Sequence, residues 1–224
     1  MKHLTFYFDV ISPYAYLAFE QLPKALAGLS YSVAYKPVLF AAMLKQHGQL
    51  GPAEITPKRE WTYRQVAWLA RESGVELQLP ASHPFNPLPL LRLALACGRP
   101  APHGQPNRWV CERVFRHVWQ GGLEPADAQR LQALAATLQH PDAPLAAETS
   151  EHAASVKQQL QSNTDEAIAL GVFGVPSVVI DGQIFWGLDA LPMLRQYLLG
   201  DDWFAGHSWK NACQVAVGAH RNKR

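Results

Sequence analysis

The sequence predicts an α/β protein in which a β-α-β unit and a β-β-α unit are separated by a long helical segment. Runs rich in aromatic and β-branched residues occur near the two ends of the chain, within residues 4–38 and 177–186. Between them, residues 40–162 carry apolar positions at helical spacing, interrupted by prolines. With 224 residues, 48% of them hydrophobic, the chain is long enough to bury a sizeable core.

The first unit is expected to be strand, helix, strand. Residues 4–10 form an apolar run that is typical of a buried strand. Ser12 can then cap a helix whose first position is Pro13, where the missing N–H costs nothing. Gly28 is a suitable end for that helix. Residues 31–38 alternate like a second strand, and the short return favours parallel pairing through a right-handed crossover.

The middle of the chain is expected to be helical. The predicted helices span residues 61–73, 88–96, 108–119, 126–138 and 148–170. The last of them is predicted to break near Asn163, because Asn163 or Thr164 can cap a new helix. The aromatic residues Trp61, Tyr63 and Trp68 recur at helical spacing, which favours packing in the core over a role in a substrate pocket.

The second unit is expected to be a hairpin followed by a helix. Residues 177–181 and 183–186 have the composition of strands, and Asp181-Gly182 between them is typical of a tight hairpin turn. Residues 188–199 show helical spacing and end at Gly200.

This order of elements is that of a thioredoxin-like domain interrupted by a large all-helical insertion. The domain is expected to comprise residues 1–39 and 163–200, and the insertion residues 40–162. Residues 201–224 are expected to form a C-terminal tail with a frayed basic end.

Composition argues against several classes of protein. Lys and Arg number 20 against 18 Asp and Glu, so charge gives no reason to expect nucleic acid or an anionic membrane as partner. No window approaches the roughly 20 apolar residues of a membrane span, and the N-terminus lacks the features of a signal peptide. A soluble cytoplasmic protein is therefore expected. Cys97, Cys111 and Cys213 form no C-x-x-C pair, and the nine histidines show no ligand spacing, so neither a dithiol centre nor a metal site is expected.

Ser12 is the first candidate site residue. The first turn of a helix offers free N–H groups and a partial positive charge, which lower the pKa of cysteines placed there. A serine cannot form a disulfide, but its hydroxyl can donate a hydrogen bond to the thiolate of a bound thiol. The alternative is that Ser12 only caps the helix.

Val175-Pro176 is the second candidate, directly before the strand at residues 177–181. A cis bond would leave the Val175 backbone groups facing the Ser12 helix, where an extended peptide could pair with them. The alternative is a trans proline that starts an edge strand. The residues by themselves favour the trans form.

Three segments carry a resemblance to a known family. They are residues 8–18 (FDVISPYAYLA), residues 171–177 (GVFGVPS) and residues 185–189 (FWGLD). In this order they resemble the 2-hydroxychromene-2-carboxylate isomerase family, which belongs with kappa-class glutathione transferases and the DsbA-like branch of thioredoxin folds. The resemblance spans nearly the whole chain. It implies a DsbA-like fold and a homodimeric, glutathione-dependent enzyme of aromatic catabolism.

The resemblance implies a role for several residues toward glutathione. Ser12 would contact the glutathione sulfur, and Val175, before a cis Pro176, would pair with the tripeptide backbone. The γ-glutamyl end would be bound by Trp186, Gly187, Leu188 and Asp189. Asp189 would face the α-amino group, a pairing of carboxylate and ammonium that is physically favourable. The alternative for Asp189 is an acid that stabilises the first turn of a helix.

The substrate half of the resemblance is less complete. Lys45 would contact the carboxylate of a small aromatic substrate, although a lone lysine on a helix is more often solvated. Relatives commonly carry an asparagine after the Gly-Pro that matches Gly51-Pro52, where this chain has Ala53-Glu54. A substrate-facing tyrosine of the family is replaced locally within residues 83–87.

The implied reaction interconverts 2-hydroxychromene-2-carboxylate and trans-o-hydroxybenzylidenepyruvate, with Ser12 stabilising the glutathione thiolate that acts as a borrowed nucleophile. Two alternatives remain open. One is a kappa-class glutathione transferase or peroxidase that acts on another electrophile. The other is a non-catalytic thioredoxin-like module that binds peptides at Val175-Pro176.

Overall fold

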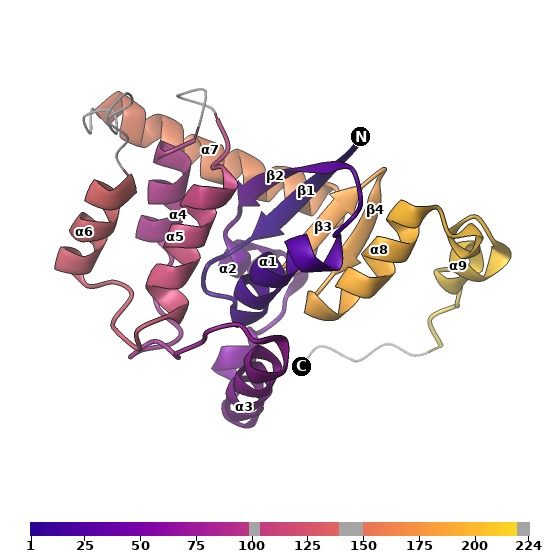
Figure 1. Ribbon diagram of the computed structural model, residues 1–224, viewed down its shortest axis with the longest axis horizontal. Helices are drawn as coiled ribbons and strands as arrows, with labels where there is room; N and C mark the ends of the chain where they lie inside the picture. Colours follow the sequence, from indigo (N-terminus) through magenta and orange to yellow (C-terminus); the bar gives the residue numbers. More distant parts are fainter. Residues whose placement is uncertain (99–103, 139–149, 219–224) are drawn as a thin grey trace.

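A four-stranded sheet lies at the centre of the protein, in a computed structural model that describes residues 1–98, 104–138 and 150–218. Its strands are β1 (Lys2–Phe8), β2 (Tyr31–Pro37), β3 (Ser177–Ile180) and β4 (Gln183–Trp186). The strand order is β2-β1-β3-β4, with β1 parallel to β2 and antiparallel to β3, and β3 antiparallel to β4 (Figure 1). The predicted α/β fold class is confirmed.

The two predicted terminal units are present. Helix α1 (Pro13–Ala25) connects β1 to the parallel strand β2. Asp181 and Gly182 both adopt positive φ angles, 50° and 74°, and form the predicted tight turn between β3 and β4. A short 3₁₀ helix, η2 (Leu188–Ala190), leads into α8 (Leu191–Leu199), which ends at Gly200 with φ 82°. The tight turn and the end of α8 confirm the predictions made from Asp181-Gly182 and from Gly200.

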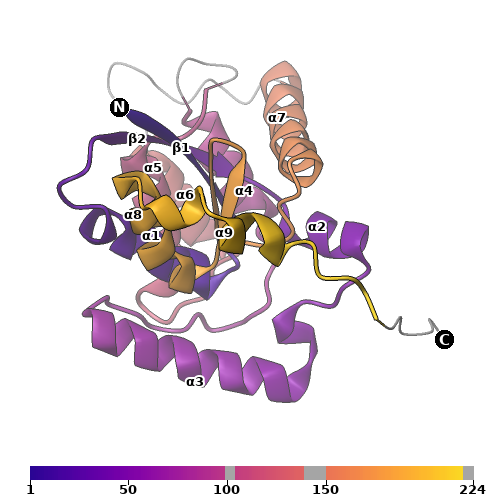
Figure 2. The same ribbon diagram turned by 90° about the vertical axis from the view of Figure 1, so that its right-hand side faces the viewer.

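Helices fill the middle of the chain. They are α2 (Phe40–His47), the 3₁₀ helix η1 (Pro52–Glu54), α3 (Thr56–Ser73), α4 (Leu88–Ala96), α5 (Arg108–Trp119), α6 (Ala128–Leu138) and α7 (Ser150–Ala169). The bounds of α4 and α5 are those predicted, and α3 begins earlier than predicted. In both views α3 lies on the opposite side of the molecule from α7 (Figures 1 and 2). The predicted break at Asn163 is wrong, because α7 continues through it.

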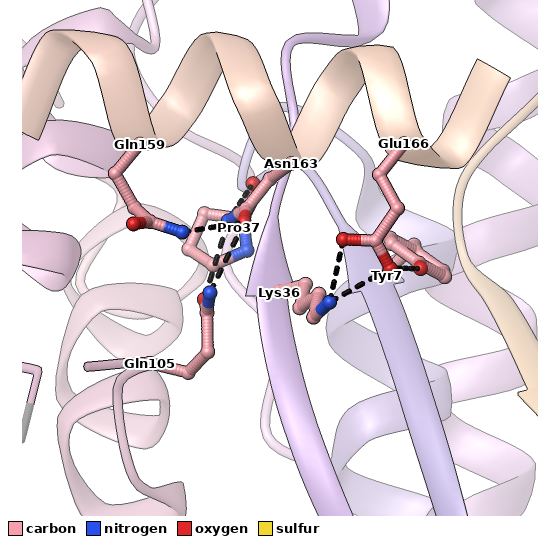
Figure 3. A network of polar contacts seen from close by, with 7 residues as sticks. All are labelled: Tyr7, Lys36, Pro37, Gln105, Gln159, Asn163 and Glu166. Atoms are coloured by element: carbon pink, nitrogen blue, oxygen red, sulfur yellow. Dashed lines mark hydrogen bonds and ion pairs between the residues drawn. The ribbon is translucent and has the colours of Figure 1, made fainter. Parts of the chain in front are cut away.

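Asn163 lies within α7, and its side chain attaches the helix to neighbouring segments (Figure 3). Its side chain is buried, and its amide nitrogen donates to the Pro37 carbonyl at 3.0 Å and to the Gln105 side chain at 3.2 Å. Its oxygen accepts from Gln105 and from Gln159, each at 3.0 Å. The side-chain groups that could cap a new helix thus bond to Pro37, to Gln105 and to the preceding turn of α7. The Thr164 hydroxyl likewise bonds to the carbonyl one turn earlier, at 2.8 Å.

Glu166 forms the second attachment of α7 to the sheet (Figure 3). Its two carboxylate oxygens accept hydrogen bonds from Lys36 Nζ on β2 at 2.7 and 2.6 Å. The Tyr7 hydroxyl on β1 donates to the same carboxylate at 2.7 Å. Burial and this bond raise the pKa of Tyr7. One face of the sheet is therefore tied to α7 by a polar cluster of Tyr7, Lys36 and Glu166.

The core lies on both faces of the sheet. Leu4, Phe6 and Phe8 alternate along β1 and pack with the side chains of α1, α4, α5 and α8. Tyr7 points the other way, into a smaller cluster with side chains of α2 and α7 such as Met43 and Ala167. Helices thus cover both faces, as the buried character of β1 requires.

The chain continues beyond α8 as η3 (Asp202–Phe204) and α9 (His207–Ala212), at the end of the molecule remote from α6 (Figure 1). The rings of Trp203, Phe204 and Trp209 pack together at centroid distances of 5.1 to 5.5 Å. The end of the tail lies outside the described residues. Among the residues that are described, no helix is both long and apolar enough to span a bilayer.

Candidate active site

The turn between β1 and α1 is the centre of the candidate site. Ser12 has the extended conformation of a helix cap, and its Oγ accepts a hydrogen bond from Ala15 N at 3.2 Å. Pro13 occupies the first helical position. The backbone N–H of Ser12 donates to the carbonyl of Asp9 at 3.1 Å, which closes the turn. The prediction that Ser12 caps α1 is therefore confirmed, and its hydroxyl lies where the positive end of α1 begins.

The loop before β3 lies next to Ser12, although the two segments are far apart in the sequence. The Val175-Pro176 peptide bond is cis, as the resemblance implies, and the trans form favoured by the residues alone is wrong. The Ser12 hydroxyl donates to the Val175 carbonyl at 3.4 Å, a long and weak bond. The hydroxyl is thus the point at which two distant segments converge.

The segment after β4 completes this side of the site. Gly187 N donates to the Pro176 carbonyl at 2.9 Å, so the two predicted glutathione segments are directly bonded. Gly187 has φ 98°, a conformation that favours glycine. Asp189 is exposed in η2, close enough to Tyr14 of α1 that its charge, together with the larger effect of burial, raises the pKa of Tyr14. A carboxylate therefore lies near the start of α1.

Trp186 and Leu188 lie on either side of Gly187. Trp186 is 53% exposed and packs against the ring of Phe173 at a centroid distance of 4.9 Å. A Cβ at Gly174 would lie 2.7 Å from the Trp186 indole nitrogen, so the glycine makes room for the indole. Leu188 is half-buried against the main core. Of these residues, Trp186 offers the larger free apolar surface.

Lys45 is the predicted site residue that the structure does not join to the others. It lies exposed in the last turn of α2. Among the described residues its ammonium group has no hydrogen-bond or ion-pair partner. Its role toward a substrate stays a prediction.

Two residues of the long segment between β2 and β3 form hydrogen bonds with the turn that carries Ser12. Trp119 Nε1 donates to the Val10 carbonyl at 2.9 Å, and His83 Nε2 lies 2.8 Å from the Ile11 carbonyl. Because a carbonyl only accepts, Nε2 of His83 carries the proton. Burial and the charge of Arg59 lower the pKa of His83, which favours the neutral ring. His83 Nδ1 then accepts from the Tyr63 hydroxyl at 2.8 Å.

Sequence reasoning missed the residues that hold this turn. Asp9 was seen only as part of a motif, and neither His83 nor Trp119 was assigned to the site. Asp9 carried one signal, a charged residue at the end of an apolar strand, where burial demands hydrogen-bond partners. The other two depend on contacts between distant segments, which no local pattern reports.

The aromatic residues of α3 differ from the core packing that was predicted. Trp61 is 61% exposed and Trp68 57% exposed, so the prediction is wrong for both. The helix turns Val66 and Ala70 toward the core and the two tryptophans away from it. Tyr63, half-buried, contacts His83 at the site.

The site has a hydroxyl at the positive end of α1 and cannot perform dithiol chemistry. Ser12 stands at the helix start, where a redox protein of this fold would need a cysteine. Burial raises the pKa of Cys111 well above its ordinary value, so that thiol is inert. The described part of the chain contains no group of three or more side chains that could bind a metal ion.

A mixed sheet with a cis-proline loop beside the N-terminus of its first helix defines a protein of the thioredoxin class. Residues 3–199 match the family model of the DSBA-like thioredoxin domain, and the chain belongs to that family. The resemblance stated from the sequence is thereby confirmed at the level of fold and family.

Characterised relatives are enzymes of two related kinds. The 2-hydroxychromene-2-carboxylate isomerase of Sphingobium xenophagum is 30% identical over 200 residues, which cover 88% of this chain and 98% of that protein. Glutathione S-transferase kappa 1 of Rattus norvegicus is 24% identical over 215 residues, covering 89% and 92%. A solved structure of a 2-hydroxychromene-2-carboxylate isomerase has the same fold, with a TM-score of 0.71, 22% identity and coverage of 96% and 100%.

Proposed function

We propose that this protein is a glutathione-dependent isomerase that interconverts 2-hydroxychromene-2-carboxylate and trans-o-hydroxybenzylidenepyruvate. One observation carries the proposal: the Ser12 hydroxyl lies at the start of α1 and 3.4 Å from the carbonyl before a cis proline. A hydroxyl held by so long a bond can turn to donate to a bound sulfur. Similarity to the isomerase of Sphingobium xenophagum supports the choice of reaction.

The residues present fit glutathione. Ser12 and the positive end of α1 would hold the sulfur as a thiolate. The backbone of Val175 would pair with the extended tripeptide. The exposed carboxylate of Asp189 would accept the α-amino group, while Trp186, Gly187 and Leu188 would enclose the γ-glutamyl end. When bound, glutathione would supply the nucleophile that adds to the conjugated carbon, permits bond rotation and leaves.

The substrate is assigned to the side of the site that faces α2. Lys45 would pair with the carboxylate of the aromatic substrate, and its exposed ammonium group suits that role. We further assign the protein to the cytoplasm and to a homodimer, in keeping with the family that it resembles.

A second candidate function is that of a kappa-class glutathione transferase or peroxidase. Similarity to glutathione S-transferase kappa 1 over nearly the whole chain favours it. The same Ser12 hydroxyl would serve, since both reactions begin with a glutathione thiolate. The two functions differ in the electrophile and in the fate of glutathione, which an isomerase releases unchanged and a transferase or peroxidase consumes.

Calorimetric titration with glutathione, followed by turnover assays, tests the proposal. Binding of glutathione, together with isomerisation of 2-hydroxychromene-2-carboxylate that S-methylglutathione does not support, is the expected result. Binding without isomerisation, but with conjugation of 1-chloro-2,4-dinitrobenzene or reduction of cumene hydroperoxide, would favour the transferase. Absence of any glutathione binding would refute both and leave the peptide-binding module.

A further inference from the structure

Asp9 is a buried carboxylate whose two oxygens serve different segments. It lies directly after β1 and has no exposed surface. Its Oδ1 accepts a hydrogen bond from Ile11 N at 3.0 Å, and its Oδ2 accepts one from Phe40 N at 2.9 Å. A buried carboxylate with a donor on each oxygen is satisfied and fixed in orientation. One side chain therefore joins the turn of Ser12 to the start of α2.

The start of α2 depends on this contact. Leu39 occupies the capping position and has no side chain that can accept a hydrogen bond. The first N–H groups of the helix are bonded instead by residues remote in sequence. Asp9 accepts from Phe40 N, and the Thr164 hydroxyl accepts from Leu39 N at 3.0 Å. Asp9 is thus a helix cap supplied from outside the helix, and its ionised form suits the positive helix end.

The turn of Ser12 depends on Asp9 as well. The Asp9 carboxylate fixes Ile11 N, and its backbone carbonyl accepts from Ser12 N at 3.1 Å. Ile11 is the residue before Ser12, so a movement of the carboxylate displaces the hydroxyl that would meet the glutathione sulfur. The same movement displaces Phe40, where the helix that carries Lys45 begins.

We propose that Asp9 is a positioning residue that couples the Ser12 end of α1 to α2, so that glutathione and the carboxylate substrate are held in one fixed relation. This inference rests on the proposed function, because it assigns one ligand to each of the two coupled elements. Asp9 itself touches neither ligand.

Titration of Asp9 can be used to detect its hydrogen bonds to Ile11 N and Phe40 N. Burial raises the pKa of Asp9 to about 7, although the N–H groups of Phe40 and Ile11 lower it in part. No charged side chain of the described residues contributes to this shift. Both amides donate to one carboxylate, so their NMR chemical shifts should titrate with a single common midpoint. Separate midpoints, or titration of only one amide, would overturn the double contact in the unaltered protein.

The coupling itself is tested by adding glutathione to the isotope-labelled protein. We expect the amides of Ser12 and Phe40 both to shift in the wild type. In Asp9→Asn one side-chain oxygen becomes an NH2 group that cannot accept, so the side chain can bond Ile11 N or Phe40 N but not both. With the connection broken, the Phe40 amide should cease to respond to glutathione. The KM for the chromene carboxylate should rise roughly tenfold for the loss of one charge-assisted bond.

Thr164→Val is the matched control. It removes the other hydrogen-bond acceptor at the start of α2 and leaves Asp9 intact. The Phe40 amide should still respond to glutathione in this variant. A response in Asp9→Asn equal to that of the wild type would overturn the inference, as would a wild-type response confined to Ser12. No response anywhere and no heat of binding would refute the proposed function as well, which separates the two failures.

Discussion

Trp119 Nε1, at the end of α5, donates a hydrogen bond to the carbonyl oxygen of Val10, in the turn after β1, at 2.9 Å. The indole is completely buried, and its ring stacks against Tyr16 of α1 at a centroid distance of 6.5 Å. Val10 lies two residues before Ser12. Trp119 therefore supports the turn that carries the candidate site, and loss of its hydrogen bond to Val10 should disturb that turn.

Trp119→Phe should destabilise the protein. The substitution keeps an aromatic ring but removes the N–H, which leaves the Val10 carbonyl without its partner inside the core. The free energy of unfolding should fall by about 1–3 kcal/mol for the unpaired buried group. Urea unfolding measures this. Trp203→Phe is the control, because Trp203 is 48% exposed and its loss should change stability little. Equal stability of Trp119→Phe and wild type would contradict the supporting role.

Ser12→Ala should lower turnover by far more than its effect on folding explains. The variant loses the cap on Ala15 N, which costs about 1 kcal/mol, and also the donor to the bound sulfur. We expect turnover at saturating glutathione to fall by about 100-fold, as for removal of one hydrogen-bond donor from an active site. The thiolate absorbance of bound glutathione near neutral pH should fall in parallel.

Asn107→Ala is the matched control for Ser12→Ala. The Asn107 side chain caps α5 by accepting from Val110 N at 2.9 Å, at a distance in sequence from the Ser12 turn. Its loss should lower stability by a similar amount and leave the thiolate absorbance unchanged. If both variants lost turnover equally, the effect of Ser12→Ala would be a consequence of capping alone.

The sequence predicted the parts of the fold that local chemistry decides. The Asp181-Gly182 turn and the bounds of α4 and α5 follow from residues within each element. The break predicted at Asn163 is wrong because two partners of that side chain, Gln105 and Pro37, lie far away in the chain. An asparagine can either cap a helix or form buried hydrogen bonds with distant segments, and the sequence does not distinguish the two.

The candidate site was predicted in the same uneven way. Ser12 and Val175-Pro176 carry local signals, a cap and an X-Pro bond, but their 3.4 Å approach exists only in the folded chain. The sequence does not distinguish His83 from the other scattered histidines, whereas in the structure it forms a hydrogen bond with the Ile11 carbonyl. The exposure of Trp61 and Trp68 could not be foreseen, since helical spacing does not say which face of α3 meets the core.

Gly187→Ala should weaken glutathione binding. Gly187 has φ 98°, and an added Cβ would collide with the Asp189 carboxylate. The backbone strain costs about 1–3 kcal/mol, and the displaced carboxylate should raise the Kd for glutathione roughly tenfold through loss of a charge-assisted bond. Gly200→Ala is the control, because Gly200 has φ 82° with open space around it. That variant should lose comparable stability but bind glutathione normally. An unchanged Kd in Gly187→Ala would argue against Asp189 as a ligand.

Glu166→Gln should alter the acid dependence of stability. Burial raises the pKa of Glu166, but hydrogen bonds from Lys36 and Tyr7 lower it by more, so it lies below the usual 4.5. A carboxyl whose pKa is lowered by folding stabilises the protein above its unfolded pKa, and this contribution is lost as the pH falls through the folded value. Wild type should therefore exceed Glu166→Gln in stability at pH 7, with the difference shrinking below pH 4.5.

Urea unfolding of both proteins between pH 7 and pH 3 measures this difference. Asp181→Asn is the control, because its ion pair with Lys2, at 3.0 Å, has both side chains about half exposed and should contribute little. Asparagine also tolerates the left-handed conformation that Asp181 adopts at φ 50°. A difference between wild type and Glu166→Gln that stayed constant across the whole pH range would show that packing, and not the charge of Glu166, attaches α7 to the sheet.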